Sequence, residues 1–247
     1  MEIKSILLGV IVIVILVVLY FWIFSDNEQH NLVTLKDATI KESIKKTAIP
    51  NPSEFSFSFW TFINNYNYNY GNKKYILYRG DGTTNVGTAA GQRFAVYLDA
   101  YKSDLVVEIT ESGETPKKRK CKVENIPLQR YSHILLSYRA RVLDIFIDGK
   151  LTKSCTLNGN FKSDDAGGLL ICPSENQVDS AKQLKKEGFK GFLASLRFFT
   201  RAIQPREAYA IYKEGYSGGN WLSDMFNKYK LKIAFMEDQR ELSSLIF

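Results

Sequence analysis

Carboxylates are the side chains that could carry hydrolysis in this chain, and their spacing argues against it. Glu108 and Glu111 lie three residues apart in an alternating stretch, so on a strand their side chains point to opposite faces. Asp144 and Asp148 would share a face, but Asp148 falls in a predicted turn. Hydrolysis of a glycosidic bond needs two carboxyl groups on one groove, one of them a general acid. The sequence therefore predicts no catalytic residue among its acids.

The two histidines, His30 and His133, offer no nucleophile–base pair, because they are far apart and no triad partner accompanies either of them. His133 falls in a predicted strand, where a packed or surface imidazole is the expected role. Together with the carboxylates, the histidines favour a protein that is not an enzyme.

Aspartates in predicted turns could supply oxygen ligands to calcium. They are Asp81, Asp99, Asp148, Asp164 and Asp165. Their spacing does not match a calcium-binding loop, so solvated loop acids are the favoured interpretation. We expect no metal site and no cofactor.

The cysteines are three in number, and an odd count argues against a fully paired secretory framework. Cys121 and Cys155 fall in strands that flank the central predicted strand. We therefore expect their Cβ atoms to lie close enough for a disulfide, which requires a Cα separation below about 7 Å. Cys172 is expected to remain unpaired.

Aromatic side chains are the remaining candidates for binding. Tyr66, Tyr68 and Tyr70 alternate with asparagines in a polar loop at 64–72. Tyrosine offers a large contact area at low conformational-entropy cost, so these three are predicted to contact a protein or a glycan. Trp221 and Phe226 are further candidates for a contact surface. A surface loop without a partner is the alternative.

The formal net charge is +7, and most basic residues are scattered along the chain. The dense cluster, Lys117-Lys118-Arg119-Lys120, has two interpretations. It is either a solvated segment that discourages strand pairing at a sheet edge, or a contact for lipid headgroups or nucleic acid. Because no nucleic-acid-binding motif accompanies it, nucleic acid is not predicted as a partner.

Residues 6–24 contain no charged side chain over 19 positions, which is close to the length that crosses a hydrocarbon core of about 30 Å. Tyr20 and Trp22 lie near its C-terminal end, as interfacial aromatics do. No small-residue cleavage site follows. The segment is therefore interpreted as a retained, single-pass anchor in a lipid bilayer.

The elements that must position these residues are strands, and the clearest of them form a hairpin. Runs rich in β-formers lie at 132–138, 142–147 and 151–157. Asp148-Gly149 joins the last two, and an Asp-Gly loop between apolar runs predicts a hairpin because a type I′ turn needs positive φ at both central residues. The implied register places Asp144 opposite Lys153.

Further alternating runs predict a mainly β protein. They lie at 54–63, 74–79, 93–98, 105–110, 120–126, 169–172, 190–199 and 230–235. Ten or more short strands with regular turns indicate an antiparallel β-sandwich. A helix is predicted at 204–215, where Pro205 takes the first helical position and Gly215 ends it.

These elements divide the chain into an anchor at 1–25, a connector at 26–50, a sandwich at 51–216 and a C-terminal extension at 217–247. The connector could add a short strand. The extension carries the late strand, which is expected to close an edge of the sandwich, and a possible second helix at 220–227.

Four segments carry a resemblance to a known family: "FSFSFWTFI", "CKVENIPLQRYSHILLSY", "LDIFIDGKLTKSCTL" and "FKGFLASLRFFTRAIQPREAYAIYKEGY". Over about 52–216 the chain resembles concanavalin A-like domains of the laminin G and pentraxin type, and most of all their membrane-anchored versions in nucleocytoplasmic large DNA viruses. Tyr131 stands where these domains usually have Trp. The resemblance implies a two-sheet jelly roll.

That fold hosts lectins, glycanases and purely structural modules, so it implies no activity by itself. The function expected from the resemblance and the anchor is structural. The chain would lie in the inner membrane of a virion, and its sandwich would contact capsid or membrane proteins. The alternative is a membrane-anchored lectin with a glycan ligand.

Overall fold

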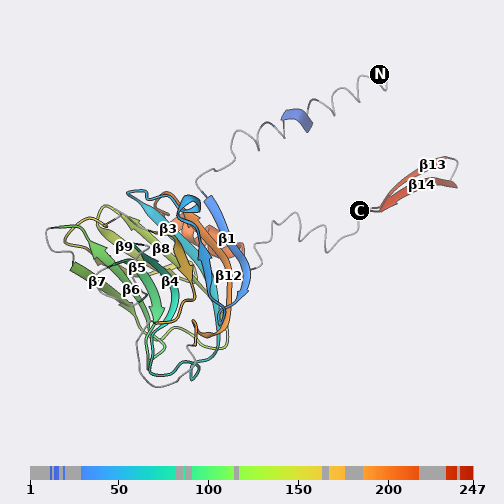
Figure 1. Ribbon diagram of the computed structural model, residues 1–247. Coiled ribbons are helices and arrows are strands. Elements are labelled where there is room, and N and C mark those ends of the chain that lie inside the picture. Colours follow the sequence, from blue (N-terminus) through green and yellow to red (C-terminus); the bar gives the residue numbers. More distant parts are fainter. Residues whose placement is uncertain are drawn as a thin grey trace.

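The computed structural model describes residues 29–81, 86, 91–113, 117–162, 167–175 and 186–216, positions 12, 14–16 and 19, and the backbone of 232–237 and 240–246. Two six-stranded antiparallel sheets pack face to face (Figure 1). Sheet A has the order β1 (Gln29–Asp37), β12 (Lys190–Phe199), β3 (Phe55–Asn65), β8 (Tyr131–Arg139), β9 (Val142–Ile147), β10 (Lys150–Thr156). Sheet B has the order β2 (Glu42–Ile44), β11 (Leu169–Ile171), β4 (Lys74–Gly80), β5 (Gln92–Leu98), β6 (Leu105–Glu111), β7 (Lys117–Val123). The predicted sandwich is confirmed.

The core between the sheets follows from the alternation in the sequence. Phe55, Phe57 and Phe59 on β3 are buried against the inner face of sheet B. Phe94 of sheet B packs against Phe55 and Phe57, with ring centroids 5.6 and 5.4 Å apart. A period of two places every second side chain of a strand on one face, so a run of alternating phenylalanines builds half of a sandwich core.

The opposite face of sheet A is buried as well, because a helix covers it. Helix α2 (Pro205–Lys213) begins with Pro at its first turn, and Gly215, with φ of +78°, follows its end. Ala208 and Ile211 of the helix pack on a second apolar cluster that includes Leu135 and Phe146. The predicted helix is confirmed, and it explains why β3 has no solvated face.

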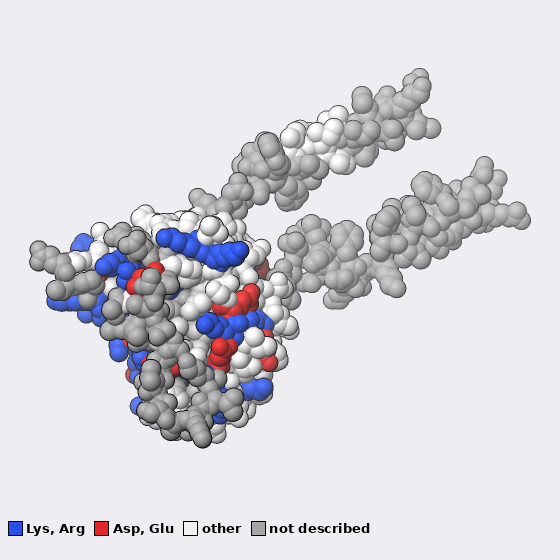
Figure 2. Space-filling view, viewed as in Figure 1, with Lys and Arg blue, Asp and Glu red and all other residues white. Residues whose placement is uncertain are grey.

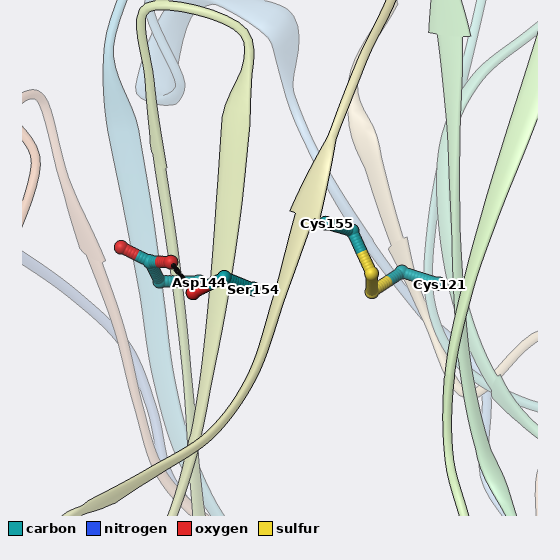
Figure 3. Close-up of a disulfide and its surroundings, with 4 residues drawn as sticks. All are labelled: Cys121, Asp144, Ser154 and Cys155. Atoms are coloured by element: carbon teal, nitrogen blue, oxygen red, sulfur yellow. Dashed lines mark hydrogen bonds between the residues drawn. A yellow bond between two sulfur atoms is a disulfide. The ribbon is translucent and has the colours of Figure 1, made fainter.

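The Asp-Gly hairpin forms as predicted, with φ of +49° at Asp148 and +73° at Gly149. Its register changes after the first two pairs, because Thr152 is an extra residue in β10. Asp144 therefore lies opposite Ser154, whose Oγ donates a hydrogen bond to its carboxylate, and the expected pairing with Lys153 is wrong (Figure 3). A bulge is tolerated here because β10 is an exposed edge strand.

The bulge decides which way Cys155 points. Cys155 lies opposite Leu143, whose side chain is in the core, so Cys155 also faces inward. If Thr152 were paired in a regular register without the bulge, Cys155 would oppose Val142 and face outward. In the structure it forms a disulfide with Cys121 of β7 at a Cα separation of 6.1 Å (Figure 3). The disulfide joins an edge strand of each sheet, and the free Cys172 is buried.

The segments outside the predicted sandwich differ from expectation in two respects. Strands β1 and β2 fall within 26–50, so the segment interpreted as a connector supplies one strand to each sheet. The late strand forms as β13 (Lys232–Glu237), but it pairs with β14 (Arg240–Ile246) in a separate two-stranded sheet. The expectation that it would close an edge of the sandwich is wrong. The possible second helix at 220–227 lies outside the described residues.

The apolar N-terminal stretch is described at five positions, all helical and with exposed side chains: Val12, Val14, Ile15, Leu16 and Leu19. Among the described residues, no helix is both long and apolar enough to cross a membrane. The other positions of 6–24 lie outside the described residues.

Candidate functional site

One end of the sandwich gathers the loops at 66–73, 99–104 and 124–130 and the hairpin turn 148–149, and we call it the loop end. The loops are joined through their backbones. Gly71 N–H donates to Ala100 C=O at 3.2 Å, and Ile126 N–H donates to Ser103 C=O at 2.6 Å. Loops that are hydrogen-bonded to each other in this way form a continuous surface on a rigid scaffold, and binding residues commonly lie on such surfaces.

Tyr66 lies inside this surface rather than on it. Its hydroxyl donates hydrogen bonds to the backbone carbonyls of Asp99 and Lys102, the first at 2.5 Å. Burial, with the nearby carboxylates of Asp99 and Asp104, raises the pKa of Tyr66. Lys74 Nζ lies 4.3 Å from the centre of its ring, and burial lowers the pKa of Lys74 to about 8. Tyr66 therefore holds the 99–104 loop in place.

Tyr70 is the most accessible of the three predicted contact tyrosines. It is 59% exposed and packs edge-on against Tyr101, which is 62% exposed, with ring centroids 5.4 Å apart. Tyr68 is half-buried, with Lys186 Nζ 5.5 Å from its ring centre. The sequence alone did not single out Tyr101, because only the fold brings the 99–104 loop beside Tyr70. Trp221 and Phe226 lie outside the described residues.

A groove of about 630 Å³ opens at the same end, between residues 123–127, the hairpin and helix α2. Tyr209 and Tyr212 of α2 line one side, and Glu124 and Asn125 line the other. Its volume lies within the usual range for ligand sites. Aromatic faces beside carboxylate and amide groups can stack on a ligand and hydrogen-bond to its polar groups.

Gly149 lets the helix approach the hairpin closely enough to form this groove. A Cβ atom on Gly149 would lie 3.0 Å from Tyr212 Cβ and 3.0 Å from Tyr209 Cδ2. The adjacent Asp148 is fixed by the backbone N–H of His133, which donates to Oδ1 at 2.9 Å, and by Arg130. The turn residue that the hairpin requires for its φ is thus also required for packing against α2.

Comparison with known families adds to this geometry. Residues 33–208 match the family model described as the concanavalin A-like lectin/glucanases superfamily. The chain belongs to this superfamily. No curated protein sequence matches it.

Solved structures agree on the fold of this concanavalin A-like domain. The receptor-binding domain of botulinum neurotoxin mosaic serotype C/D matches with a TM-score of 0.51 at 10% identity, over 75% of this chain and 45% of that one. The binding domain of Paraclostridial Mosquitocidal Protein 1 matches with a TM-score of 0.52 at 13% identity, over 75% of this chain and 45% of that one. The concanavalin A-like chain spans less than half of each, and at these identities the likeness concerns the fold alone.

Since the superfamily includes glucanases, the carboxylates of the domain matter. Glu108, on the outer face of sheet B, is 3% exposed. It accepts hydrogen bonds from Tyr97 Oη and Gln92 Nε2, both at 2.7 Å, and lies 3.3 Å from Lys120 Nζ. Burial alone would raise its pKa, but the bonds from Tyr97 and Gln92 and the charge of Lys120 lower it. Glu108 is thus held as a carboxylate, whereas a general acid needs a raised pKa.

Glu111 does not join Glu108 at a common groove. It follows the core-facing Val107 and Ile109 on β6, and its carboxylate accepts the backbone N–H of Asn158 at 2.9 Å. The two glutamates therefore lie on opposite faces of sheet B, as the spacing predicted.

A serine–histidine contact, which the sequence reasoning missed, lies beneath α2. His133 Nε2 and Ser58 Oγ are 2.9 Å apart, and both residues are fully buried. Burial, with the charge of Arg197, lowers the pKa of His133 to about 3. A histidine with this pKa is a weak base, and the helix covers it, so the contact is structural. The pairing of β3 with β8 would have been the signal for it.

The described aspartates considered as calcium ligands, Asp81, Asp99 and Asp148, do not form a metal-binding group. Asp99 Oδ1 accepts the N–H of Tyr101 at 3.1 Å, and Asp148 is occupied by His133 and Arg130. In the part of the chain that the structure describes, no three His, Cys, Asp or Glu side chains form a group that could hold a metal ion. Asp164 and Asp165 lie outside that part.

Proposed function

We propose that the chain is a single-pass membrane protein of a large DNA virus particle, anchored in its inner membrane by residues 6–24. Its concanavalin A-like domain binds other virion or membrane proteins through the loop end. The observation that carries this proposal is the exposed Tyr70–Tyr101 pair, which lies at the opposite end of the sandwich from the start of β1.

The positions of the two ends follow from strand pairing. Gln29, the first residue of β1, lies opposite Phe199, and Phe199 lies opposite Ser56 near the start of β3. Strand β3 then runs to Asn65 and enters the loop end. A bilayer joined to the chain just before Gln29 would therefore lie at the end away from Tyr70, which leaves that end free to meet partners.

The ionisation of Glu108 and the burial of His133 support a binding role rather than a catalytic one. Glu108 is held ionised by its hydrogen bonds, and His133 is covered by a helix. Exposed tyrosines, in contrast, are common at the centres of protein interfaces. An anchored protein also needs only modest contacts, because its partners in the same membrane are at high effective concentration. The virion assignment is supported by the resemblance to membrane-anchored viral domains.

A crosslinking experiment with paired variants tests the proposal. Partners are crosslinked to the full chain in particle membranes and compared with the Tyr70→Ser/Tyr101→Ser variant. We expect the variant to fold, because both side chains are exposed, and to lose its protein crosslinks and its incorporation into the particle. Leu151→Ser, which removes an apolar side chain that is 51% exposed on β10, is the control. Unchanged crosslinks and incorporation in the double variant would contradict the proposal.

The second candidate function is a membrane-anchored lectin, and the groove favours it. Tyr209, which is 45% exposed, lines the groove with Glu124 and Asn125, an arrangement suited to the apolar face and hydroxyl groups of a sugar, and Tyr212 beside it stacks on Trp60. A glycan array probed with the full chain separates the two functions. Binding that Tyr209→Ser removes and Tyr70→Ser/Tyr101→Ser leaves intact would favour the lectin.

A further inference from the structure

The end of the sandwich opposite the loop end carries exposed basic side chains from both sheets. Lys117 and Arg119 come from the start of β7, and Arg139 and Arg141 flank the β8–β9 turn. All four are exposed, and we call this surface the basic end. In Figure 2, Lys and Arg side chains lie along the side of the molecule that carries β7 in Figure 1, and others lie across the rest of the visible face.

The two pairs of basic residues lie on one continuous surface. Lys117 and Arg119 alternate in phase with Cys121, whose disulfide to Cys155 crosses to sheet A, so they lie on the face of β7 turned toward that sheet. From the other side, Arg141 C=O accepts the N–H of Leu157 at 2.7 Å. The next residue, Asn158, donates to the carboxylate of Glu111, which lies opposite Lys117 across β6 and β7.

The charge of this surface is not neutralised by the described residues. None of the four basic side chains forms an ion pair with a described residue; they are Lys117, Arg119, Arg139 and Arg141. Two described carboxylates lie nearby: Glu111 is buried and accepts the N–H of Asn158, and Glu54 lines a pocket with Tyr138 and Ala140. Lys120 and Lys122 of β7 differ, since Lys120 pairs with Glu108 and Lys122 pairs with Asp104, whereas Lys118 donates to Gln92 Oε1 at 3.2 Å.

The β8–β9 turn that carries the two arginines has an unfavourable backbone. Ala140 has φ of +46° and Arg141 has φ of +69°, both in the left-handed region, and neither is a glycine. Turns of this kind strongly prefer Asn-Gly or Gly-Gly, because side chains with a Cβ resist positive φ. Backbone strain of this kind concentrates at functional positions.

The basic end is also the end at which the apolar N-terminal segment joins the sandwich. Gln29 lies opposite Phe199 at the end of β12, and Phe55 lies opposite Tyr138, the residue before Arg139. Only residues 25–28 separate Phe24 from Gln29, so even a fully extended link is at most about 18 Å long. The tether therefore allows this end to come within the Debye length of about 8 Å at physiological salt, where a charged leaflet attracts it.

We infer that the basic end docks on the anionic headgroups of the bilayer that residues 6–24 enter, with Lys117, Arg119, Arg139 and Arg141 as the contact. The inference rests on the proposed anchor. Each basic side chain near an anionic surface strengthens its attraction roughly fivefold. Four of them fix the orientation of the domain and direct the loop end away from the membrane. Nucleic acid could meet the same charge, but it would not account for the position of the tether.

The full chain is reconstituted in nanodiscs of two compositions. One contains phosphatidylcholine alone, and the other also contains about 30% phosphatidylserine, which makes the surface anionic. Hydrogen exchange is measured at the β8–β9 turn and the start of β7. We expect slower exchange only in the anionic discs, and loss of this protection at high salt. Arg139→Glu/Arg141→Glu and, independently, Lys117→Glu/Arg119→Glu should remove it. Lys150→Glu/Lys153→Glu makes the same change in net charge on β10 and should keep it.

Equal exchange in both kinds of disc would overturn the inference, as would equal loss of protection in the β10 variant. Protection by duplex DNA added to phosphatidylcholine discs, without protection by anionic discs, would assign the surface to nucleic acid instead. Failure of the chain to remain in any disc would refute the anchor. In that case anionic vesicles are added to the full chain: binding that depends on Arg139 and Arg141 would support the lipid contact, and no binding would overturn it.

Discussion

Acidification from pH 7 to pH 5 should destabilise this protein through one buried imidazole. His133 on β8 is fully buried beneath α2, where its Nε2 contacts Ser58 Oγ at 2.9 Å and its ring lies 5.1 Å from that of Trp60. Burial, reinforced by the positive charge of Arg197, lowers its pKa to about 3. The imidazole therefore stays neutral in the folded protein at pH 5, where an unfolded histidine is protonated.

The size of the effect follows from the two pKa values. The unfolded chain binds a proton at His133 below a pKa of about 6.5, and the folded chain does so only near 3. Unfolding therefore takes up a proton between these values, and stability falls as the pH falls through this window. Between pH 7 and pH 5 the loss is about 2 kcal/mol.

The window from pH 7 to pH 5 separates His133 from the shifted carboxylates. Hydrogen bonds to Asp37 and Asp104 lower their pKa values, and the pKa of Glu108 is also lowered. A lowered carboxylate pKa stabilises the folded state above the unfolded pKa of about 4, so this stabilisation is lost only at lower pH. Among the described groups with a shifted pKa, His133 is thus the one that acts between pH 7 and pH 5.

The assay is urea unfolding of the full chain in detergent at pH 7, 6 and 5, followed by circular dichroism. His133→Gln keeps a polar group beside Ser58 and removes the titration, so its stability should change little over this range. His30→Gln is the control and should retain the slope of the unchanged protein. If His133→Gln loses as much stability on acidification as the unchanged protein does, the assignment of the slope to this imidazole is wrong.

Four further changes have defined outcomes. Replacing both Cys121 and Cys155 with Ser should lower the free energy of unfolding by roughly 3–4 kcal/mol relative to the disulfide-bonded protein, as expected for a loop of 34 residues, in urea titrations. Deletion of Thr152 should remove the bulge and leave Cys155 opposite Leu143, so that the disulfide still forms and thiol labelling detects no additional free cysteine. Gly149→Ala should destabilise by about 1–3 kcal/mol, because φ is +73° and its Cβ would crowd α2; a loss below about 0.5 kcal/mol would contradict this packing. Tyr66→Phe should accelerate hydrogen exchange in the 99–104 loop while leaving the rest of the sandwich protected.

The sequence predicted those parts of the fold in which neighbouring residues decide the outcome. Alternation in "FSFSFWTFI" is sufficient to predict a strand with an apolar face, because the period of two is a local property. Asp148-Gly149 predicts its turn for the same reason. Helix α2 was predictable from Pro205 and Gly215, which act on the backbone within one turn.

Register at an exposed edge is not a local property. In β10, "KLTKSCT", neither face is apolar, so the sequence does not oppose a shift by one residue. The predicted register and the predicted disulfide were therefore incompatible, since Cys155 faces inward only after the bulge. The cross-link and the core together hold the register that the local pattern left open.

The candidate site was only partly predictable, for a similar reason. Tyr66, Tyr68 and Tyr70 follow one another in a loop without strand or helix period, so the sequence cannot distinguish the tyrosine that anchors the loop from the one that is exposed. Tyr101 and the groove exist only after loops distant in sequence come together. The position of α2 against Gly149 is likewise a tertiary contact.

The basic end and the Tyr70–Tyr101 pair lie at opposite ends of the sandwich, and the distance between them limits what the two tyrosines can bind. Exposed tyrosines occur both at membrane interfaces and at protein interfaces. Strand β3 has 11 residues, so at about 3.3 Å per residue it holds the loop end roughly 36 Å from the start of the strand. With the basic end on a bilayer, the tyrosine pair lies far beyond the headgroups and cannot insert into the same membrane. A pair held at that distance, on a sandwich whose sheets are cross-linked at their edges, is therefore placed to contact a protein or glycan partner rather than the lipid of the same bilayer.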